Sequence, residues 1–173
     1  MIFTVAMPKW SADAQASVQR FRRAHDPQFG LIAPHFTLVF GATLEEEAYV
    51  AHVRAVARAA KPLAFSLSHA MLYYTGDGPA HVYLVASEGA AALTRLYRQL
   101  HGGPMAPWLR LDKPFVPHIT IAALGDPAAA LQIADEWNAQ NLCLSGEIDA
   151  LTAGRISDGG FRVLAETSLE ATQ

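Results

Sequence analysis

The chain has 173 residues, of which 51% are hydrophobic and 17% are charged. This length and composition favour one globular domain with a hydrophobic core and argue against a disordered chain. The formal net charge of −3 argues against an extended surface that holds long nucleic acid by its phosphates, although a single nucleotide or an RNA end needs only a few local cations.

The N-terminus and the lone cysteine indicate where the protein is expected to reside. The first ten residues lack the basic segment and the long apolar stretch of a signal peptide, and we expect no membrane-spanning segment. A single cysteine, Cys143, cannot form an intrachain disulfide, and its apolar surroundings predict a buried, inert thiol. We therefore expect a cytoplasmic monomer that contacts no membrane.

The first half of the chain predicts a strand, a helix, a strand, a helix and a two-stranded hairpin. These elements are expected at residues 2–7, 12–25, 35–40, 44–60 and 63–74 with 80–86. Ser11 is a suitable N-cap for the first helix. Thr43 with Glu46 forms a capping box that would open the second helix, and Pro62 would close it. The Gly-rich turn "TGDGP" joins the two strands of the hairpin.

The second half predicts the same order without the first strand. A helix, an irregular loop, a strand, a helix and a hairpin are expected at residues 88–101, 104–115, 116–123, 127–141 and 142–156 with 161–168. Ser87 would cap the first of these helices, and Gly102 would end it. Asp126 caps the second helix and Pro127 takes its first position. The turn "SDGG" would join the strands of the last hairpin.

This repeated order indicates an internal duplication. Two histidines, His35 and His118, lie 83 residues apart, and the proposed caps Thr43 and Asp126 each follow their histidine by eight residues. We predict a single α+β domain in which two pseudo-symmetric lobes place central antiparallel sheets along a groove, with helices outside. The domain would span residues 1–173, with lobes at approximately 1–86 and 87–173.

The two histidines stand in matching strand motifs, "APHFTLVF" and "VPHITIAA". Side chains alternate between the faces of a strand. One face of the first strand is therefore expected to carry His35, Thr37 and Val39, and the other face Phe36, Leu38 and Phe40. The apolar face would pack under the outer helices. The second motif places His118 and Thr120 in the same way, so both pairs are expected to face the central groove.

Two imidazoles and two hydroxyls around one groove suit chemistry at phosphorus. Imidazole titrates near neutral pH and can act as a base on water or as an acid on a leaving oxygen. Threonine hydroxyls can donate hydrogen bonds to the non-bridging oxygens of a phosphate. A single strand histidine is more often a core or surface residue, but a doubled motif at matching positions favours function. Metal binding is a weaker alternative, because the carboxylates or thiolates usual at such sites do not accompany the histidines.

At these residues the chain resembles the two-histidine phosphoesterase superfamily, and within it the bacterial 2′-5′ RNA ligase or RNA cyclic phosphodiesterase branch. The segments that carry the resemblance are "RAHDPQFGLIAPHFTLVF" and "PFVPHITIAAL". It implies opening of a 2′,3′-cyclic phosphate, at an RNA end or on a nucleotide, to a 2′-phosphate. Neither a metal nor another cofactor is implied.

The resemblance also implies roles for individual residues. His35 and His118 would be catalytic, with His118 as the base on water and His35 as the acid on the leaving oxygen, an order that the near-symmetry leaves open. Thr37 and Thr120 would bind substrate. Arg110 and Lys113, just before the second motif, are candidate phosphate contacts. Arg22 and Arg23 are further cations near the first motif. Two alternatives stay open, a binding module without catalysis and a ligase that runs the reverse reaction.

Overall fold

A computed structural model describes residues 1–157 and 159–170. Within these residues the chain forms a nine-stranded antiparallel sheet in the order β2-β7-β4-β5-β6-β3-β1-β8-β9. The strands are β1 (Ile2–Ala6), β2 (Lys9–Trp10), β3 (Phe36–Ala42), β4 (Leu63–Tyr73), β5 (Ala80–Ala86), β6 (His118–Leu124), β7 (Leu144–Ile148), β8 (Ala150–Ser157) and β9 (Gly160–Ser168). The helices are α1 (Ala12–His25), α2 (Glu46–Arg58), α3 (Ala90–Leu100), the 3-10 helix η1 (Gly103–Trp108) and α4 (Pro127–Asn138).

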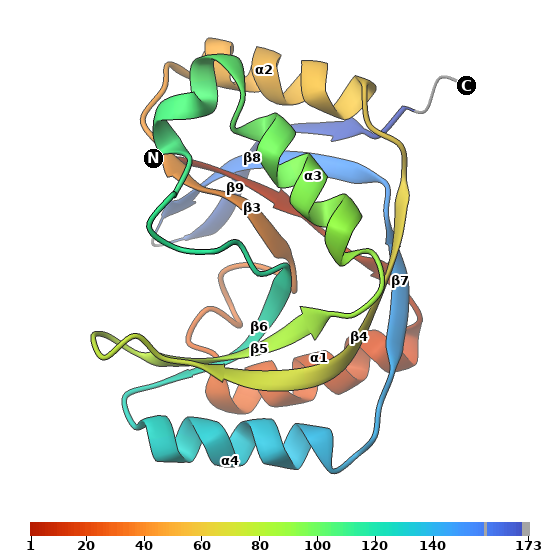
Figure 1. Ribbon diagram of the computed structural model, residues 1–173, viewed down its shortest axis with the longest axis vertical. Coiled ribbons are helices and arrows are strands. Elements are labelled where there is room, and N and C mark those ends of the chain that lie inside the picture. Colours follow the sequence, from red (N-terminus) through yellow and green to blue (C-terminus); the bar gives the residue numbers. More distant parts are fainter. Residues whose placement is uncertain (158, 171–173) are drawn as a thin grey trace.

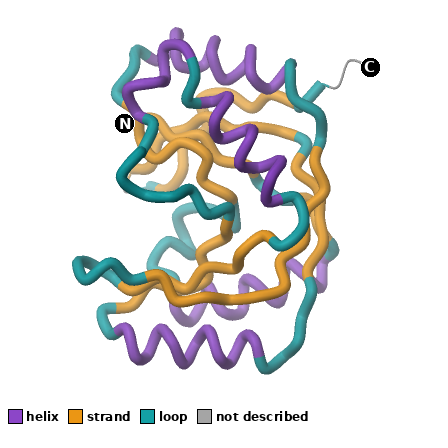
Figure 2. The backbone as a smooth tube through the Cα atoms, viewed as in Figure 1, coloured by secondary structure: helices purple, strands orange, loops and turns teal. Residues whose placement is uncertain are grey.

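The sheet curls, and its helices lie outside the curl, so the predicted fold class is confirmed (Figures 1 and 2). Helices α1 and α4 pack on the strands from β4 to β6, and α2 and α3 pack mainly on β1, β3, β8 and β9. The strands β3 and β6, which carry the two motifs, are neighbours at the centre of the sheet. The concave side of the curl is therefore where the two motifs can meet.

On either side of the junction between β6 and β3, the sheet contains strands from both halves of the sequence. The second-half strand β7 pairs with β2 and β4, β6 lies between β5 and β3, and β8 pairs with β1, so strands of the two halves are interspersed across the sheet. Two helices likewise pack on a strand from the other half of the sequence. Helix α1 precedes β3 but packs on β6, and α3 precedes β6 but packs on β3. The lobes proposed for residues 1–86 and 87–173 stay a prediction, and in the structure the elements of the two sequence halves pack against one another.

The predicted helix caps are confirmed for α1 and α4. The Ser11 hydroxyl accepts from the Ala14 N–H at 3.2 Å, and the Asp126 carboxylate accepts from the Ala128 N–H at 2.9 Å, with Pro127 in the first helical position. Each side chain satisfies a backbone donor that the helix itself leaves free. Asp126 therefore fixes where α4 begins, directly after the motif strand β6.

The predicted caps of α2 and α3 are wrong. Helix α2 begins at Glu46, and its cap is Glu45, whose carboxylate accepts from the Ala48 N–H at 3.0 Å; Thr43 lies outside the helix. Helix α3 is preceded by Gly89 in a left-handed conformation, where a Cβ would lie 2.4 Å from the Ala64 carbonyl oxygen. Only glycine fits this close approach. Ser87 instead hydrogen-bonds to Ser66 across the sheet.

The C-terminal segments also differ from the prediction. The strand expected at 142–156 is two strands, β7 and β8, and β7 pairs with β4 and β2. Cys143 is exposed rather than buried, because it precedes β7 and has no sheet partner there. In the last hairpin, Ser157 pairs with Gly160, and the Asp158 position of the predicted turn lies outside the described residues. Across the part of the chain that is described, no helix has the length and apolar character needed to cross a membrane.

Candidate active site

The two motifs meet where β3 and β6 cross. In the described residues the pairing of these strands is limited to Phe36 opposite Ile119, and both of these side chains are buried. Because neighbouring side chains point to the opposite face of a strand, the residues on either side of this pair face the concave side. These residues are His35 and Thr37 on one strand and His118 and Thr120 on the other.

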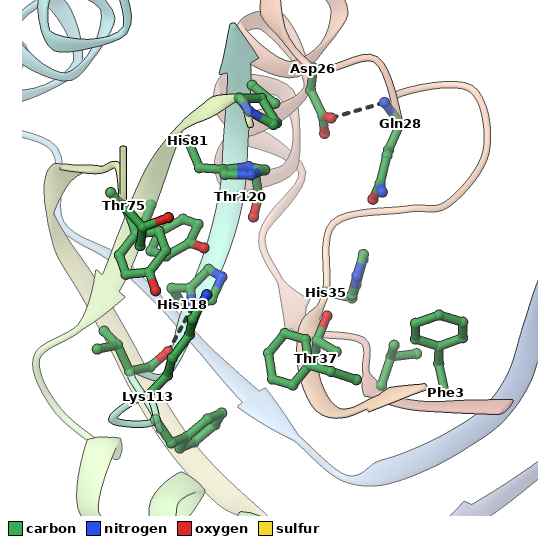
Figure 3. Close-up of a pocket in the computed structure, with 18 of the residues that line it drawn as sticks. Phe3, Asp26, Gln28, His35, Thr37, Thr75, His81, Lys113, His118 and Thr120 are labelled. Carbon is green, nitrogen blue, oxygen red and sulfur yellow. Dashed lines mark hydrogen bonds between the residues drawn. The ribbon is translucent and has the colours of Figure 1, made fainter. Parts of the chain in front are cut away.

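All four motif side chains line one cavity of about 540 Å³. Figure 3 shows His35 and Thr37 on one side of this space and His118 and Thr120 on the other. The rest of the lining comes from strands on both sides of the junction between β6 and β3 and from the loops before each motif. Its polar or aromatic members include Asp26, Gln28, Tyr73, His81, Tyr83, Arg110, Lys113 and Phe115, and its apolar members include Phe3, Val5, Phe40 and Ile156.

Each histidine holds one ring nitrogen against the backbone. Nδ1 of His35 lies 2.8 Å from the Ala33 carbonyl oxygen, and Nδ1 of His118 lies 2.6 Å from the Val116 carbonyl oxygen. A carbonyl oxygen only accepts, so Nδ1 carries the proton in both rings. The neutral form of each ring then has its lone pair on Nε2. This is the nitrogen that can take a proton from water or, once protonated, give one to an oxygen.

Burial makes both imidazoles poor bases in the free protein. Burial lowers the pKa of His118 to about 4, and the nearby charges of His35 and His81 act in the same direction. Burial is also the first cause that lowers the pKa of His35, with a smaller contribution from Arg22 that Asp26 opposes. Both rings are therefore mainly neutral near pH 7 when no anion is bound.

A β-bulge follows the threonine in each motif strand. Val5 of β1 lies opposite Thr37, and Thr4 lies opposite Val39, so Leu38 is skipped. In the other lobe, Tyr83 of β5 lies opposite Thr120, and Val82 lies opposite Ala122, so Ile121 is skipped. A bulge bends its strand and redirects the side chains beyond it. The two motifs thus share a local backbone irregularity as well as a sequence.

The first bulge corrects the predicted alternation beyond Leu38. Val39 is buried, whereas Phe40 is 44% exposed and lines the cavity, the reverse of the predicted faces. The extra residue moves the side chains that directly follow it to the other face, up to a second irregularity between Val39 and Ala42. Phe40 therefore forms part of an apolar wall of the cavity, together with Phe3 and Ile156.

Aromatic rings cover the second histidine. The rings of Tyr83 and His118 are stacked, with centroids 3.5 Å apart and planes 17° apart, and Tyr73 stacks on Tyr83 at 4.9 Å. Neither Tyr83 nor His81 is predicted from the sequence as a residue of the cavity. Alternation along the strand at 80–86, which places both on one face, is the pattern that could have identified them.

The predicted cations divide between the cavity and the protein interior. Arg110 and Lys113 both line the cavity, and Arg110 also pairs with Asp112 at 3.1 Å. Arg22 contributes to the lining but is only 1% exposed and forms a buried ion pair with Asp26. Among residues 1–157 and 159–170, no cluster of three or more His, Cys, Asp or Glu side chains is arranged to hold a metal ion.

Comparison with known proteins identifies the family and the fold. A family model described as the 2′-5′ RNA ligase superfamily matches residues 10–160. A Halalkalibacterium halodurans protein, provisionally named as a phosphoesterase, is 32% identical over 115 residues, which make up 64% of each chain. This chain thus spans just under two thirds of the length of that relative.

Two solved structures show the same fold. TT0787 of Thermus thermophilus has a TM-score of 0.67 at 22% identity and covers 99% of both chains. E. coli LigT complexed with 3′-AMP has a TM-score of 0.61 at 18% identity and covers 98% of both chains. At these identities the likeness is one of fold.

Proposed function

The chain belongs to the 2′-5′ RNA ligase superfamily, the family predicted from its paired motifs, and we propose that it hydrolyses a cyclic phosphodiester. The bond opened would be that of a 2′,3′-cyclic phosphate, at an RNA end or on a nucleotide, and the product a 2′-phosphomonoester. The observation that carries the proposal is the convergence of two histidines and two threonines, from opposite strands, on one cavity. RNA processing, a cytoplasmic location and a monomeric state stay predictions.

In the proposed reaction the two histidines act on opposite sides of the phosphorus atom. Nε2 of His118 takes a proton from water, and the water oxygen forms a bond to phosphorus. The bond from phosphorus to O3′ breaks, and protonated Nε2 of His35 gives its proton to the departing O3′. The Nδ1 bonds to Val116 and Ala33 keep Nε2 as the reactive nitrogen in both rings.

The hydroxyls and cations of the cavity would hold the phosphate. Thr37 and Thr120 lie next to the histidines and can donate hydrogen bonds to the non-bridging oxygens, where negative charge gathers in the transition state. Arg110 and Lys113, at the edge of the same cavity, supply positive charge for the phosphate or the rest of the substrate. The structure of LigT with 3′-AMP supports a nucleotide as the ligand class for this fold.

Turnover of 2′,3′-cyclic nucleotides by the purified protein tests the proposal. We expect the wild type to release the 2′-phosphate isomer, and His35→Ala and His118→Ala each to lower kcat by roughly 10²–10⁴-fold, as loss of acid or base catalysis does. His69→Ala is the matched control, because His69 is an exposed histidine of β4 that does not line the cavity. Circular dichroism would establish that all three variants fold.

Two other outcomes would replace the proposal. Binding of a cyclic nucleotide without turnover, in the presence or absence of added divalent metal, would make the site a binding module. Joining of a 2′,3′-cyclic phosphate end to a 5′-hydroxyl end, at a rate that exceeds hydrolysis, would identify a ligase that uses the same residues in reverse.

A further inference from the structure

We propose that Tyr83 is a positioning residue that makes the two histidines unequal, by holding the ring of His118 in one plane while His35 has no equivalent support from β1. This inference rests on the proposed function for its catalytic consequence. Its structural consequence, a fixed and shielded His118 ring, is measurable without turnover.

The contact is a close stack of two rings. The centroids of Tyr83 and His118 lie 3.5 Å apart, and the planes differ by 17°. Tyr73, on the neighbouring strand β4, stacks on Tyr83 at 4.9 Å with the same interplanar angle. Because β5 lies between β4 and β6, Tyr83 is itself held between two partners. Such a stack restricts tilting of the imidazole and excludes water from one of its faces.

The pseudo-symmetry of the fold shows what stands in the equivalent position of the other lobe. Tyr83 lies opposite Thr120, immediately before the bulge of β6. Val5 lies opposite Thr37, immediately before the bulge of β3. Both residues line the cavity. Where the repeat places a tyrosine ring beside the second histidine, it places only an aliphatic side chain beside the first.

This difference has a chemical meaning for a reaction that needs one base and one acid. The Nδ1 bond to Val116 fixes one direction in the plane of the His118 ring, and the stack fixes the plane itself. Together they aim the Nε2 lone pair at one point of the cavity, as abstraction of a proton from water requires. His35 keeps its Nδ1 bond to Ala33 but can tilt more freely. The geometry thus supports His118 as the base.

The stack also contributes to the burial of His118. Burial is the first cause of its low pKa, and the other titratable groups that act on it are His35, across the cavity, and His81, on the same strand as Tyr83. Removal of the Tyr83 ring would open one face of the imidazole to water. The imidazolium form would then be better solvated, and the pKa of His118 should rise toward its ordinary value.

The test compares Tyr83→Val with Tyr83→Phe. Valine copies the residue that the other lobe carries at this position, whereas phenylalanine keeps the ring and removes the hydroxyl. The first readout is the pKa of each histidine ring, measured in the free protein by an NMR titration of the imidazole protons. The second is kcat and KM for a 2′,3′-cyclic nucleotide. Tyr74→Val is the matched control, because Tyr74 is exposed, bonds to the Gly76 carbonyl and does not line the cavity.

We expect Tyr83→Val to raise the pKa of His118 more than that of His35 and to lower kcat about tenfold with little change in KM, as a small misplacement of a catalytic group does. Tyr83→Phe should restore most of both properties. An unchanged His118 pKa in a folded Tyr83→Val protein would overturn the inference, and so would an equal loss in Tyr83→Phe. If wild type turns over no cyclic phosphate, the proposed function fails, but the NMR comparison still decides whether Tyr83 holds His118.

Discussion

The hydrogen bond from Nδ1 of each catalytic candidate to a carbonyl two residues earlier decides which ring nitrogen can react. It occurs in both motifs, at 2.8 Å for His35 and 2.6 Å for His118. The sequence alone predicts the two histidines and their threonines, because strand alternation places both on one face. It does not predict the tautomer, since that depends on how the chain turns before each strand.

The low pKa values of the two histidines predict an acidic pH optimum. The base must be neutral and the acid protonated, so kcat/KM rises with pH through the lower of the two pKa values and falls through the higher. Both values lie below the ordinary 6.5, and that of His118 is about 4. We therefore expect a bell-shaped profile of kcat/KM with its maximum between about pH 4 and pH 6.5.

The measurement is kcat/KM for a 2′,3′-cyclic mononucleotide from about pH 4 to about pH 9, with circular dichroism at each pH. In Tyr83→Val the limb that belongs to His118 should move toward higher pH. A maximum above pH 7 in the wild type would contradict the prediction, because the two histidines could not then both have lowered pKa values in the free protein.

Beyond the motif pairs, residue-level prediction fails where the backbone is irregular. Phe40 lines the cavity because a bulge at Leu38 reverses the alternation that the sequence suggests. A bulge leaves little trace in the pattern of apolar residues, since both Val39 and Phe40 suit a buried face. The role of Tyr83 is not predicted from the sequence for another reason. Its importance comes from a contact with a residue on the adjacent strand, and only the register of β5 with β6 brings the two rings together.

At the scale of elements, the segment between α1 and β3 is fixed by a buried ion pair. Nε of Arg22 donates to the Asp26 carboxylate at 2.7 Å, and Nη2 of Arg22 donates to the Ile32 carbonyl at 2.8 Å. The Asp26 carboxylate also accepts from the Gln28 N–H at 2.9 Å (Figure 3). These bonds fold the segment back on the end of α1, and the chain then enters His35 from a defined direction.

We predict that Arg22→Met lowers the free energy of unfolding by roughly 3–5 kcal/mol, because it leaves the Asp26 carboxylate buried and unpaired. The double variant with Asp26→Leu should recover part of this loss, since no buried charge remains. Urea unfolding provides the measurement. Arg155→Met is the matched control, as Arg155 forms an exposed pair with Glu46 at 3.1 Å and should cost only about 0–1 kcal/mol. Equal losses in Arg22→Met and Arg155→Met would contradict the prediction.

The sequence predicts the order of most elements but less often the residue that starts them. Ser11 and Asp126 are caps in the structure. The sequence indicates them because each is a short polar residue just before a segment with the apolar periodicity of a helix. Thr43 and Ser87 match the same pattern and are not caps. A carboxylate at Glu45, which accepts from the Ala48 N–H, and a tight approach at Gly89 start those helices instead. The approach at Gly89 depends on Ala64, which is distant in the sequence.

At the scale of the whole molecule, the repeat explains why the site lies where it does. The two lobes exchange helices and strands, so that each motif strand is packed by elements of the other half. The strands β3 and β6 are neighbours, and each places its histidine and threonine on the same cavity. The sequence spacing predicts the duplication. It does not predict the interlocking, because the spacing of motifs is the same whether the lobes stand side by side or exchange elements.

The burial of several histidines should make the folded molecule sensitive to acid. Burial is the first cause of a lowered pKa at His35, His81, His101 and His118. Well above pH 6.5 these groups are neutral in both the folded and unfolded chain and do not affect stability. As the pH falls below 6.5, the unfolded chain binds protons that the folded chain does not, so the free energy of unfolding decreases until the pH reaches the folded pKa values.

We therefore expect the urea midpoint to be lower at about pH 5 than at about pH 7.5, a range in which the carboxylates of the unfolded chain stay mostly ionised. His118→Asn should reduce this difference, because it removes the group whose pKa falls to about 4, while asparagine can still donate to the Val116 carbonyl. His69→Asn, at an exposed position on β4, should leave the difference unchanged. If the wild-type midpoint is the same at both pH values, the imidazoles of the cavity are solvated in the folded protein. If His118→Asn retained the full difference, the His118 imidazole would be solvated in the folded protein, and the acidic limb assigned to His118 in the proposed reaction would lose its physical basis.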